Sequence, residues 1–370
     1  MIVSGRLVLE DRVEPGRIEI SDGRITAVEY DPAAADGPLV APGFVDVHIH
    51  GWGGHDAMGD TAALDGMARA LLRHGVTSFL PSGVSAPLPA LAEFTERVRG
   101  WMPVAPDDGA APLGFNLEGP FLADAKRGAH DPAMLVDPAD ADPADIAPLL
   151  DGLRLITIAP ERPGALALIA QLHALGVRIA LGHSAATLVE ARAGYDAGAT
   201  STTHLFNGMS GVDHRAPGLA AAALVDDRAY VELIADGEHV DPAIWPLITR
   251  TKPADRLLLI SDAIPLAGTG DGRASVGGLE IEVTGQRVTL VGTSTLAGSV
   301  IALDSAVRNL VASGVGLPAA VAAASRNPLA MLGVADRGRL APGQRAHLVE
   351  LDDDLRVRRV LRDERWVDGA

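Results

Sequence analysis

The sequence predicts an α/β fold, a (β/α)8 TIM-like barrel with a small β-sandwich domain built from both chain ends. Short apolar runs alternate with helix-like stretches through the middle of the chain, which is the pattern of βα units in a parallel sheet. Both ends instead hold short alternating segments broken by glycine, which is typical of antiparallel strands. Residues with ligating or catalytic side chains follow the apolar runs, as in barrels whose active sites lie at the carboxyl ends of the strands.

Length, charge and composition limit the class of protein. The 370 residues exceed an average single domain but suit a large barrel with an accessory domain. The formal charge of −17 argues against a nucleic-acid or anionic-membrane partner, so any phosphate site must be local. The apolar runs are too short to cross a bilayer, there is no cysteine, and the first residues lack a secretory pattern. We expect a soluble, cytoplasmic protein.

The alternating segments at the two chain ends resemble each other, and we predict that they pair. The small β domain would then comprise residues 1–40 plus 338–370, interrupted in sequence by a barrel domain at 41–337.

Eight apolar runs are the predicted barrel strands. They span residues 44–50, 76–81, 113–118, 153–159, 178–183, 199–205, 230–235 and 256–261. The polar residues at or just after their ends are His48, His50, Ser82, Glu118, Glu161, His183, Ser184, His204, Asn207, Asp236, His239 and Asp262. This placement is too regular for scattered surface residues.

The first predicted strand carries two histidines, His48 and His50. Side chains on a strand repeat every two residues, so both rings leave the same face, roughly 7 Å apart along the chain and close enough to share a metal ion. On an isolated strand a structural role in the core would explain them equally well.

Three other strand ends supply Glu118, His183 and His204. A barrel mouth would bring them together as a two-histidine, one-carboxylate set, which leaves metal positions open for water and substrate. The metal would polarise a carbonyl and lower the pKa of a bound water. Taken alone, Glu118 could be a surface carboxylate before Gly119-Pro120, and His183 and His204 could each be a structural histidine.

Asp262 ends the eighth predicted strand. A carboxylate beside the metal can take a proton from the attacking water and pass it to the leaving amine, so we predict that Asp262 is the general base and acid. The alternative is a helix cap. Pro265 and a long glycine-rich loop, which follow Asp262, argue against a helix there.

The motifs resemble those of a known family. Residues 42–51 (PGFVDVHIHG) resemble the opening strand of the amidohydrolase superfamily of metal-dependent barrels. The later motifs are similar, in order, to those of the N-acetylglucosamine-6-phosphate deacetylase family: NLEGPF at 116–121, GHSAAT at 182–187, THLFNGM at 203–209 and SDA at 261–263. The resemblance covers nearly the whole chain, including the split β domain.

The resemblance implies roles at matching positions. Glu118, His183 and His204 match the principal metal ligands, and Asp262 matches the acid/base. His130, within GAHDP at 128–132, would help to polarise the acetyl carbonyl. The residues implied in substrate binding are Ala129, Asn207, Gly208, Arg215, His239, Leu296, Ala297 and Gly298.

The resemblance also implies a homodimer, because in the family the phosphate-binding groups reach across a dimer interface. Arg215 suits a phosphate through its fork of donors. His214, its neighbour, has no matched function, and we expect it to be an exposed loop residue.

The implied cofactor is a divalent metal, one or two ions per subunit, with zinc or iron favoured and manganese or cobalt also compatible with the ligands. Some family members replace the His-X-His pair and use one metal. This chain keeps His48 and His50 and lacks a lysine at the fourth strand end, so Glu118 is the natural bridge to a second ion. His55 and Asp56 fit a turn or lid better than that second site.

The predicted reaction is hydrolysis of N-acetyl-D-glucosamine 6-phosphate to D-glucosamine 6-phosphate and acetate. A deacetylase of another N-acetyl amino-sugar phosphate, for example the galactosamine epimer, remains an alternative. A cyclic-amide hydrolase of the same superfamily would have no use for Arg215 and His239. A non-catalytic sugar-phosphate sensor should have lost Asp262 or a metal ligand, and none is lost.

Overall fold

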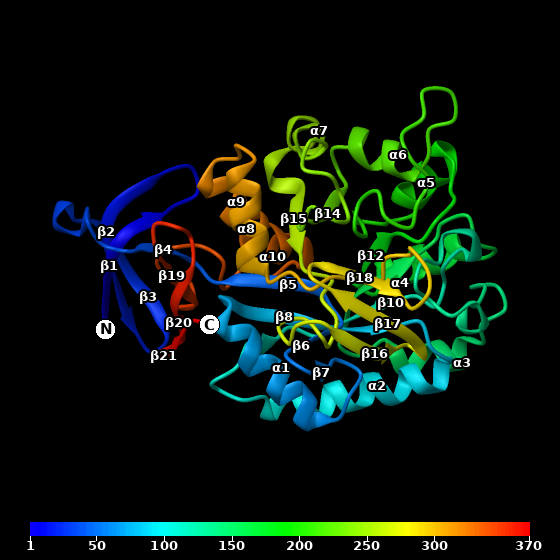
Figure 1. Ribbon diagram of the computed structural model, residues 1–370, viewed down its shortest axis with the longest axis horizontal. Coiled ribbons are helices and arrows are strands. Elements are labelled where there is room, and N and C mark those ends of the chain that lie inside the picture. The colour runs from blue at the N-terminus through cyan, green and yellow to red at the C-terminus, as the bar shows by residue number, and fades with distance from the viewer.

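The computed structural model describes residues 1–370 and shows two sheet-based domains side by side (Figure 1). The smaller one is a seven-stranded sheet in the order β21-β20-β19-β4-β1-β2-β3. Its strands are β1 (Ile2–Val8), β2 (Val13–Ser21), β3 (Arg24–Tyr30), β4 (Leu39–Pro42), β19 (Leu348–Leu351), β20 (Val357–Arg362) and β21 (Arg365–Asp368). Strand β4 pairs in parallel with β1 and antiparallel with β19, so it joins the two chain ends.

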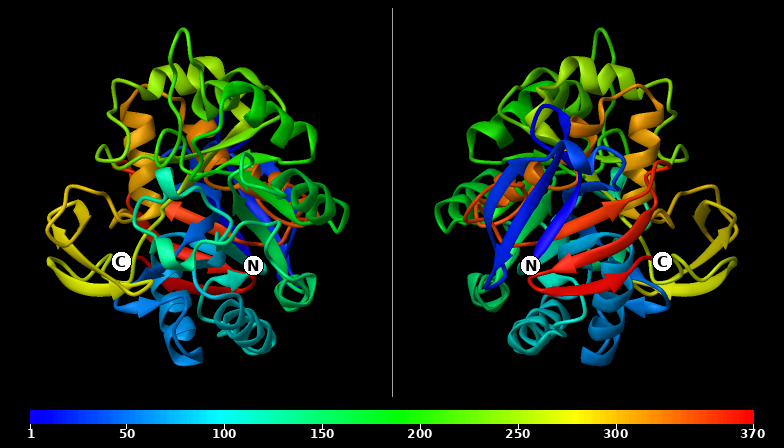
Figure 2. Two further views of the ribbon diagram at one scale, coloured as in Figure 1. Left: turned by 90° about the vertical axis from the view of Figure 1, so that its right-hand side faces the viewer. Right: turned by 90° about the vertical axis from the view of Figure 1, so that its left-hand side faces the viewer.

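This smaller sheet has its own core. Leu7 and Ile18 from the N-terminal strands pack in one cluster with Leu348 and Leu361 from the C-terminal strands. Blue and red strands therefore lie next to each other in Figure 2. The pairing of the two chain ends is as the sequence predicts. The domain limits at residues 40 and 338 stay a prediction.

The larger domain is a nearly closed parallel barrel. Its strands run β5 (Phe44–Ile49), β8 (Val76–Val84), β10 (Phe115–Glu118), β11 (Leu153–Ile158), β12 (Arg178–Leu181), β13 (Ser201–Thr202), β14 (Tyr230–Ile234) and β15 (Leu257–Ile260). They are neighbours in chain order, and the short β9 (Ala111–Pro112) pairs beside β8. Each strand overlaps one of the eight predicted runs, so the predicted barrel is confirmed.

The last and first strands meet at the carboxyl end of the barrel. The backbone N–H of Asp262 donates to the His48 carbonyl at 2.9 Å, and the N–H of His50 donates to the Ala263 carbonyl at 2.8 Å. These bonds hold Asp262 beside the first strand, at the point where the barrel closes.

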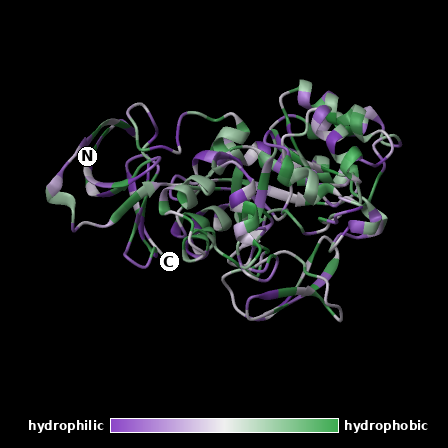
Figure 3. Ribbon diagram, turned by 90° about the horizontal axis from the view of Figure 1, so that it is seen from above, coloured by the Kyte–Doolittle hydropathy of each residue, from purple (hydrophilic) through white to green (hydrophobic).

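Helices surround the barrel, and hydrophobic residues concentrate in its elements (Figure 3). The α-helices are α1 (Thr61–Arg73), α2 (Leu88–Trp101), α3 (Pro143–Ile146), α4 (Ala165–Ala174), α5 (Leu188–Asp196), α6 (Leu219–Val225), α7 (Trp245–Thr251), α8 (Leu303–Ala312), α9 (Leu317–Ala323) and α10 (Arg326–Leu332). Short 3-10 turns occur at Pro32–Ala34, Met102–Val104, Asp124–Lys126, Pro132–Met134, Ala147–Leu149 and Ala254–Arg256. None of these helices has both the length and the apolar character needed to span a bilayer.

The segment after Asp262 differs from the predicted glycine-rich loop. It holds a three-stranded antiparallel sheet, β16 (Gly272–Val276), β17 (Leu279–Thr284) and β18 (Arg287–Leu290), which we call the cover sheet. Figure 2 shows it in yellow, projecting from the barrel. Its inner face has its own small core, which contains Ile281, Val283 and Val288. A second short hairpin, β6 (Gly51–Trp52) and β7 (His55–Asp56), follows β5.

Candidate functional site

A cavity of about 270 Å³ opens at the carboxyl ends of the barrel strands. All but two of the predicted site residues line it: His50, Glu118, Ala129, His130, His183, His204, Asn207, Gly208, His239, Asp262, Leu296, Ala297 and Gly298. The two exceptions are His48, which is buried below the cavity, and Arg215, which lies in a loop outside it. The fold thus gathers residues from strands spread along the whole barrel.

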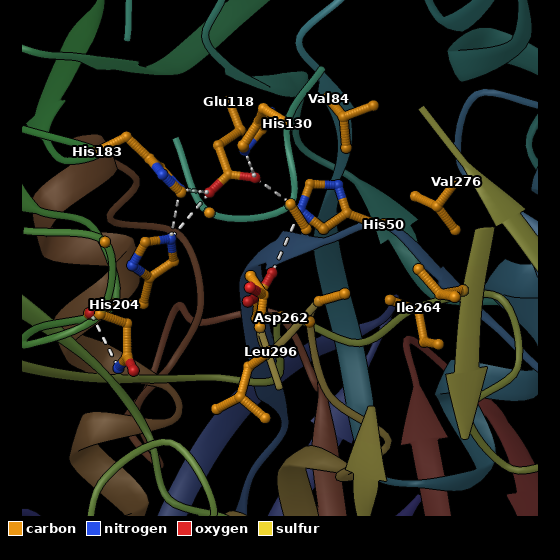
Figure 4. Close-up of a pocket in the computed structure, with 18 of the residues that line it drawn as sticks. His50, Val84, Glu118, His130, His183, His204, Asp262, Ile264, Val276 and Leu296 are labelled. Atoms are coloured by element: carbon orange, nitrogen blue, oxygen red, sulfur yellow. Dashed lines mark hydrogen bonds and ion pairs between the residues drawn. The ribbon is translucent and has the colours of Figure 1, made fainter. Parts of the chain in front are cut away.

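Glu118 is the centre of the cluster (Figure 4). Its Oε1 atom lies 2.9 Å from Nε2 of His183 and 2.9 Å from Nε2 of His204, and these two nitrogens are 3.1 Å apart. Its Oε2 atom lies 3.2 Å from Nε2 of His50 and 3.3 Å from Nε2 of His130. One buried carboxylate therefore faces imidazole nitrogens on both of its oxygens.

Three of these residues have backbone angles that strand residues rarely adopt. His183 (φ 45°), His204 (φ 24°) and Asp262 (φ 50°) each follow the last residues of a barrel strand in the left-handed region. For residues other than glycine such angles cost on the order of 1–3 kcal/mol each and concentrate at functional sites. The surrounding hydrogen bonds hold this strain in place.

Hydrogen bonds also fix the orientation of the rings. Nδ1 of His183 donates to the Lys126 carbonyl at 2.8 Å, and Nδ1 of His50 donates to the Ser82 carbonyl at 3.1 Å. These Nδ1 contacts turn the Nε2 atom of each ring toward Glu118. Such outer partners are the usual support of metal-binding histidines.

This donor set fits a divalent cation. Nε2 of His183 and Nε2 of His204 lie 3.1 Å apart and both face one oxygen of Glu118 at 2.9 Å, an arrangement that a positive charge between them would stabilise. Around a tetrahedral ion with bonds of about 2.0–2.1 Å, ligand atoms lie about 3.3 Å apart, close to the observed spacings. Imidazole with carboxylate suits zinc and iron as well as manganese and cobalt.

The pKa shifts within the cluster also favour positive charge beside the carboxylates. Burial alone would lower the pKa of His50, but Asp262 and Glu118 raise it to about 9. Burial opposes ionisation of Glu118, yet His48 and His130 hold its pKa well below the usual range. The carboxylates therefore stay charged at neutral pH.

Asp262 approaches the same nitrogen of His50 as Glu118 does. Its Oδ1 atom is 3.2 Å from Nε2 of His50 and 3.6 Å from Nε2 of His48. No helix begins at Asp262, because the chain continues into a bridge between Ala263 and Ser299. The helix-cap interpretation of Asp262 is therefore excluded.

Arg215 and His239 differ in placement. Arg215 is exposed, in a turn where the side chain of Asp213 accepts its N–H at 2.8 Å, and it does not reach the cavity of its own chain. His239 lines the cavity, and its Nδ1 atom pairs with Asp236 at 2.7 Å. His55 and Asp56 lie in the β7 hairpin, outside the cavity.

The structure adds site residues that the sequence did not single out. An apolar side of the cavity is formed by Val84, Ile264, Val276 and Ile281. Glu232, in the middle of β14, is fully buried and lies 3.2 Å from Nδ1 of His48. A charged residue inside the apolar run YVELI was a signal that the sequence did offer.

A parallel (β/α)8 barrel with a carboxylate–imidazole cluster at its mouth defines a metal-dependent barrel hydrolase. A family model described as "Amidohydrolase family" matches residues 39–367. The chain belongs to this family of metal-dependent enzymes.

Within the family the chain is similar to amino-sugar phosphate deacetylases. It is 40% identical to the N-acetylgalactosamine-6-phosphate deacetylase of Escherichia coli O157:H7, over 98% of this chain and 97% of that protein. It is 39% identical to the N-acetylglucosamine-6-phosphate deacetylase of Bos taurus, over 94% of this chain and 87% of that one.

Solved structures of deacetylases are also similar to this chain. A mutant N-acetyl-D-glucosamine-6-phosphate deacetylase of Mycobacterium smegmatis, in complex with N-acetyl-D-glucosamine 6-phosphate, is 40% identical with a TM-score of 0.92, over 100% of this chain and 99% of that one. The Thermotoga maritima N-acetylglucosamine-6-phosphate deacetylase is 32% identical with a TM-score of 0.94 and full coverage of both chains.

Proposed function

We propose that this enzyme hydrolyses the acetamide of N-acetyl-D-glucosamine 6-phosphate, releasing D-glucosamine 6-phosphate and acetate. The observation that carries the proposal is the convergence of Asp262 and the Glu118–His183–His204 cluster on one cavity. The similarity to deacetylases of this substrate over nearly the whole chain supports it. The reaction belongs to amino-sugar metabolism.

A divalent ion held by Glu118, His183 and His204 would supply Lewis-acid polarisation of the acetyl carbonyl and a water of lowered pKa. Asp262 then takes a proton from the attacking water and delivers it to the leaving nitrogen. His130 donates to the carbonyl oxygen as negative charge develops there. Burial lowers the pKa of His130, which favours a neutral ring in this role.

We assign substrate contacts to the remaining cavity residues. Asn207, Gly208 and His239 bind the sugar or its phosphate, while Ala129 and the segment formed by Leu296, Ala297 and Gly298 lie on the acetyl side. The apolar wall formed by Val276 and Ile281 keeps bulk water from the reacting atoms.

We also propose a homodimer, in which Arg215 serves the phosphate site of the partner subunit. Arg215 is exposed and remote from the cavity of its own chain, which is the placement that such a role requires. A guanidinium can bind a phosphate through paired hydrogen bonds.

Zinc or iron is the proposed metal, with one or two ions per subunit, and manganese or cobalt also suits the ligands. A cytoplasmic location is proposed because phosphorylated sugars are charged and stay in the compartment where they are made.

A second candidate is the galactosamine epimer. It is favoured by the similarity to the N-acetylgalactosamine-6-phosphate deacetylase, which at 40% identity is comparable to that of the glucosamine enzymes. The two substrates differ in one hydroxyl, so both bring the acetamide to the same metal site.

The test is a deacetylation assay over N-acetylglucosamine and N-acetylgalactosamine, each with and without 6-phosphate, together with metal analysis of the purified protein. Highest kcat/KM on the 6-phosphorylated glucosamine derivative supports the proposal. Preference for the galactosamine derivative transfers the function to the second candidate. Activity independent of the phosphate would overturn both.

A further inference from the structure

Glu232 is a carboxylate buried in the barrel interior. It has no exposed surface, and its neighbours along β14, Val231 and Leu233, are apolar and equally buried. No lysine or arginine pairs with it, and the only group within ion-pair distance is His48. A fully buried carboxylate without a cationic partner is rare, so this position calls for an explanation.

The contacts of Glu232 reach two different strand ends. Its Oε2 atom lies 3.2 Å from Nδ1 of His48 and accepts the backbone N–H of His204 at 3.3 Å. Its Oε1 atom has no hydrogen-bond partner. One carboxylate therefore connects the first strand of the barrel with a residue of the Glu118 cluster.

Acceptance of a hydrogen bond from Nδ1–H directs the Nε2 lone pair of His48 away from Glu232. That lone pair faces Nε2 of His50 at 3.2 Å, Oε1 of Glu118 at 3.6 Å and Oδ1 of Asp262 at 3.6 Å. Ligand atoms from these four residues lie within 4.8 Å of one another. They form a second donor set that shares Glu118 with the His183–His204 set.

The charges in this region can balance a second cation. Glu118, Asp262 and Glu232 bring three negative charges to buried positions, and neutral rings bring none. With neutral rings, one divalent ion would leave a buried net charge of −1 and two would leave +1, so a second ion costs no more net buried charge than the first ion alone.

We propose that Glu232 is a positioning residue that commits His48 to a second divalent ion, held together with His50, Glu118 and Asp262. This inference rests on the proposed function as a metal-dependent deacetylase. Glu232 touches neither substrate nor ion in this scheme and acts through the ring of His48, as carboxylate partners of metal-binding histidines do.

The experiment measures zinc binding to the full-length, metal-stripped protein by titration against a competing chelator, with metal analysis after dialysis. The wild type should bind two zinc ions. The Glu232→Gln variant keeps the shape and loses the charge, so it should weaken one of the two sites by roughly 10–100-fold and leave the other unchanged. Cobalt loading gives a second readout, because the absorption of the second ion should fall or shift.

Glu350→Gln is the matched control. Glu350 is also a buried glutamate, but it lies on β19 and pairs with Arg359, far from the cluster. The Glu350→Gln variant should bind both ions normally. Glu232→Asp keeps the charge and shortens the side chain, so it should weaken the same site less than Glu232→Gln does. If Glu232→Gln does not fold, Glu232→Asp replaces it in the titration.

A double variant isolates the route of action. If Glu232 acts through His48, then Glu232→Gln should have no further effect on metal binding in a His48→Gln background. One zinc ion in the wild type, or two in Glu232→Gln with unchanged affinities, overturns the proposal. Neither result touches the proposed reaction, which the sugar-phosphate assay tests independently.

Discussion

Nε2 of His204 lies 2.9 Å from Oε1 of Glu118, the same oxygen that Nε2 of His183 meets at 2.9 Å. Three donor atoms from three strands are thus held together at the barrel mouth. Removal of the cation that we assign there should abolish deacetylation and lower the melting temperature, since a ligand at 100 times its Kd stabilises a protein by about 2.7 kcal/mol. Chelation followed by a thermal melt and a rate assay measures both effects.

Restoration with zinc, iron, manganese or cobalt would then identify the metal that supports turnover. The control is Glu118→Gln, whose melting temperature should respond little to the chelator because the variant holds the ion poorly. Equal responses of wild type and variant would contradict the assignment of Glu118 as a ligand.

Asp262→Asn should separate binding from catalysis. The amide has nearly the shape of the carboxylate but cannot take a proton, so kcat should fall about 10²–10⁴-fold while KM for the phosphorylated sugar changes little. Steady-state kinetics with a parallel metal analysis measure this split. Near-normal turnover with full metal content would remove Asp262 from the acid/base role.

Arg215→Ala tests the phosphate role across a dimer. Loss of a bidentate charged contact should raise KM for N-acetylglucosamine 6-phosphate far more than for N-acetylglucosamine. His214→Ala is the matched control, because His214 is the adjacent residue in the same exposed turn, and it should leave both KM values near wild type.

The oligomeric state gives an independent check on this assignment. Light scattering should show a dimer, and inactive Asp262→Asn subunits mixed with Arg215→Ala subunits should recover phosphate-dependent activity. The assignment would be refuted by a monomer, or by equal effects of Arg215→Ala on both sugars.

The barrel could be predicted from sequence because each strand is an apolar run that ends in a polar residue. A strand such as Leu257–Ile260 is buried on both faces, so its pattern is continuous and easily recognised. The positions of Glu118 and Asp262 at strand ends followed from the same rule. The 2.9 Å contacts of Glu118 with His183 and His204 did not follow from this rule, because they depend on positive φ angles at the two histidines.

The cover sheet was not predicted for a different reason. Its strands alternate in burial against a small satellite core, and the glycines at 277, 278 and 285 indicate loop as strongly as hairpin turn. Glu232 could not be predicted from the rule that site residues follow strand ends, because it lies in the middle of β14.

Asp363 should make stability sensitive to acid. It lies in the turn between β20 and β21, and His347, whose Nε2 atom is 3.3 Å from its Oδ1 atom, together with Arg345 lowers its pKa to about 2. Because the folded state binds this proton less tightly than the unfolded state, the stabilisation is present above about pH 4 and is lost as the pH falls toward 2. Urea midpoints between pH 5 and pH 2 measure it.

Asp363→Asn should flatten this pH dependence, since asparagine tolerates the positive φ of 55° at this turn but carries no charge. The control is Asp22→Asn, a second turn aspartate with positive φ that makes no ion pair, and it should keep the slope of the wild type. Parallel curves for wild type and Asp363→Asn would show that the contacts of Asp363 contribute no pH-dependent stability.

The apolar wall of the cavity can be tested with two residues of the cover sheet. Ile281 and Val283 belong to the same small core, but only Ile281 also lines the cavity. Ile281→Ala should therefore raise KM by about 10-fold or more, in line with a lost apolar contact to a ligand, and leave kcat less affected. Val283→Ala should loosen the sheet with little change in KM.

Limited proteolysis of residues 272–290 reports the integrity of the sheet in both variants. If both variants raise KM equally and become equally sensitive to protease, the cover sheet acts only through its folding, and Ile281 makes no contact of its own with the substrate.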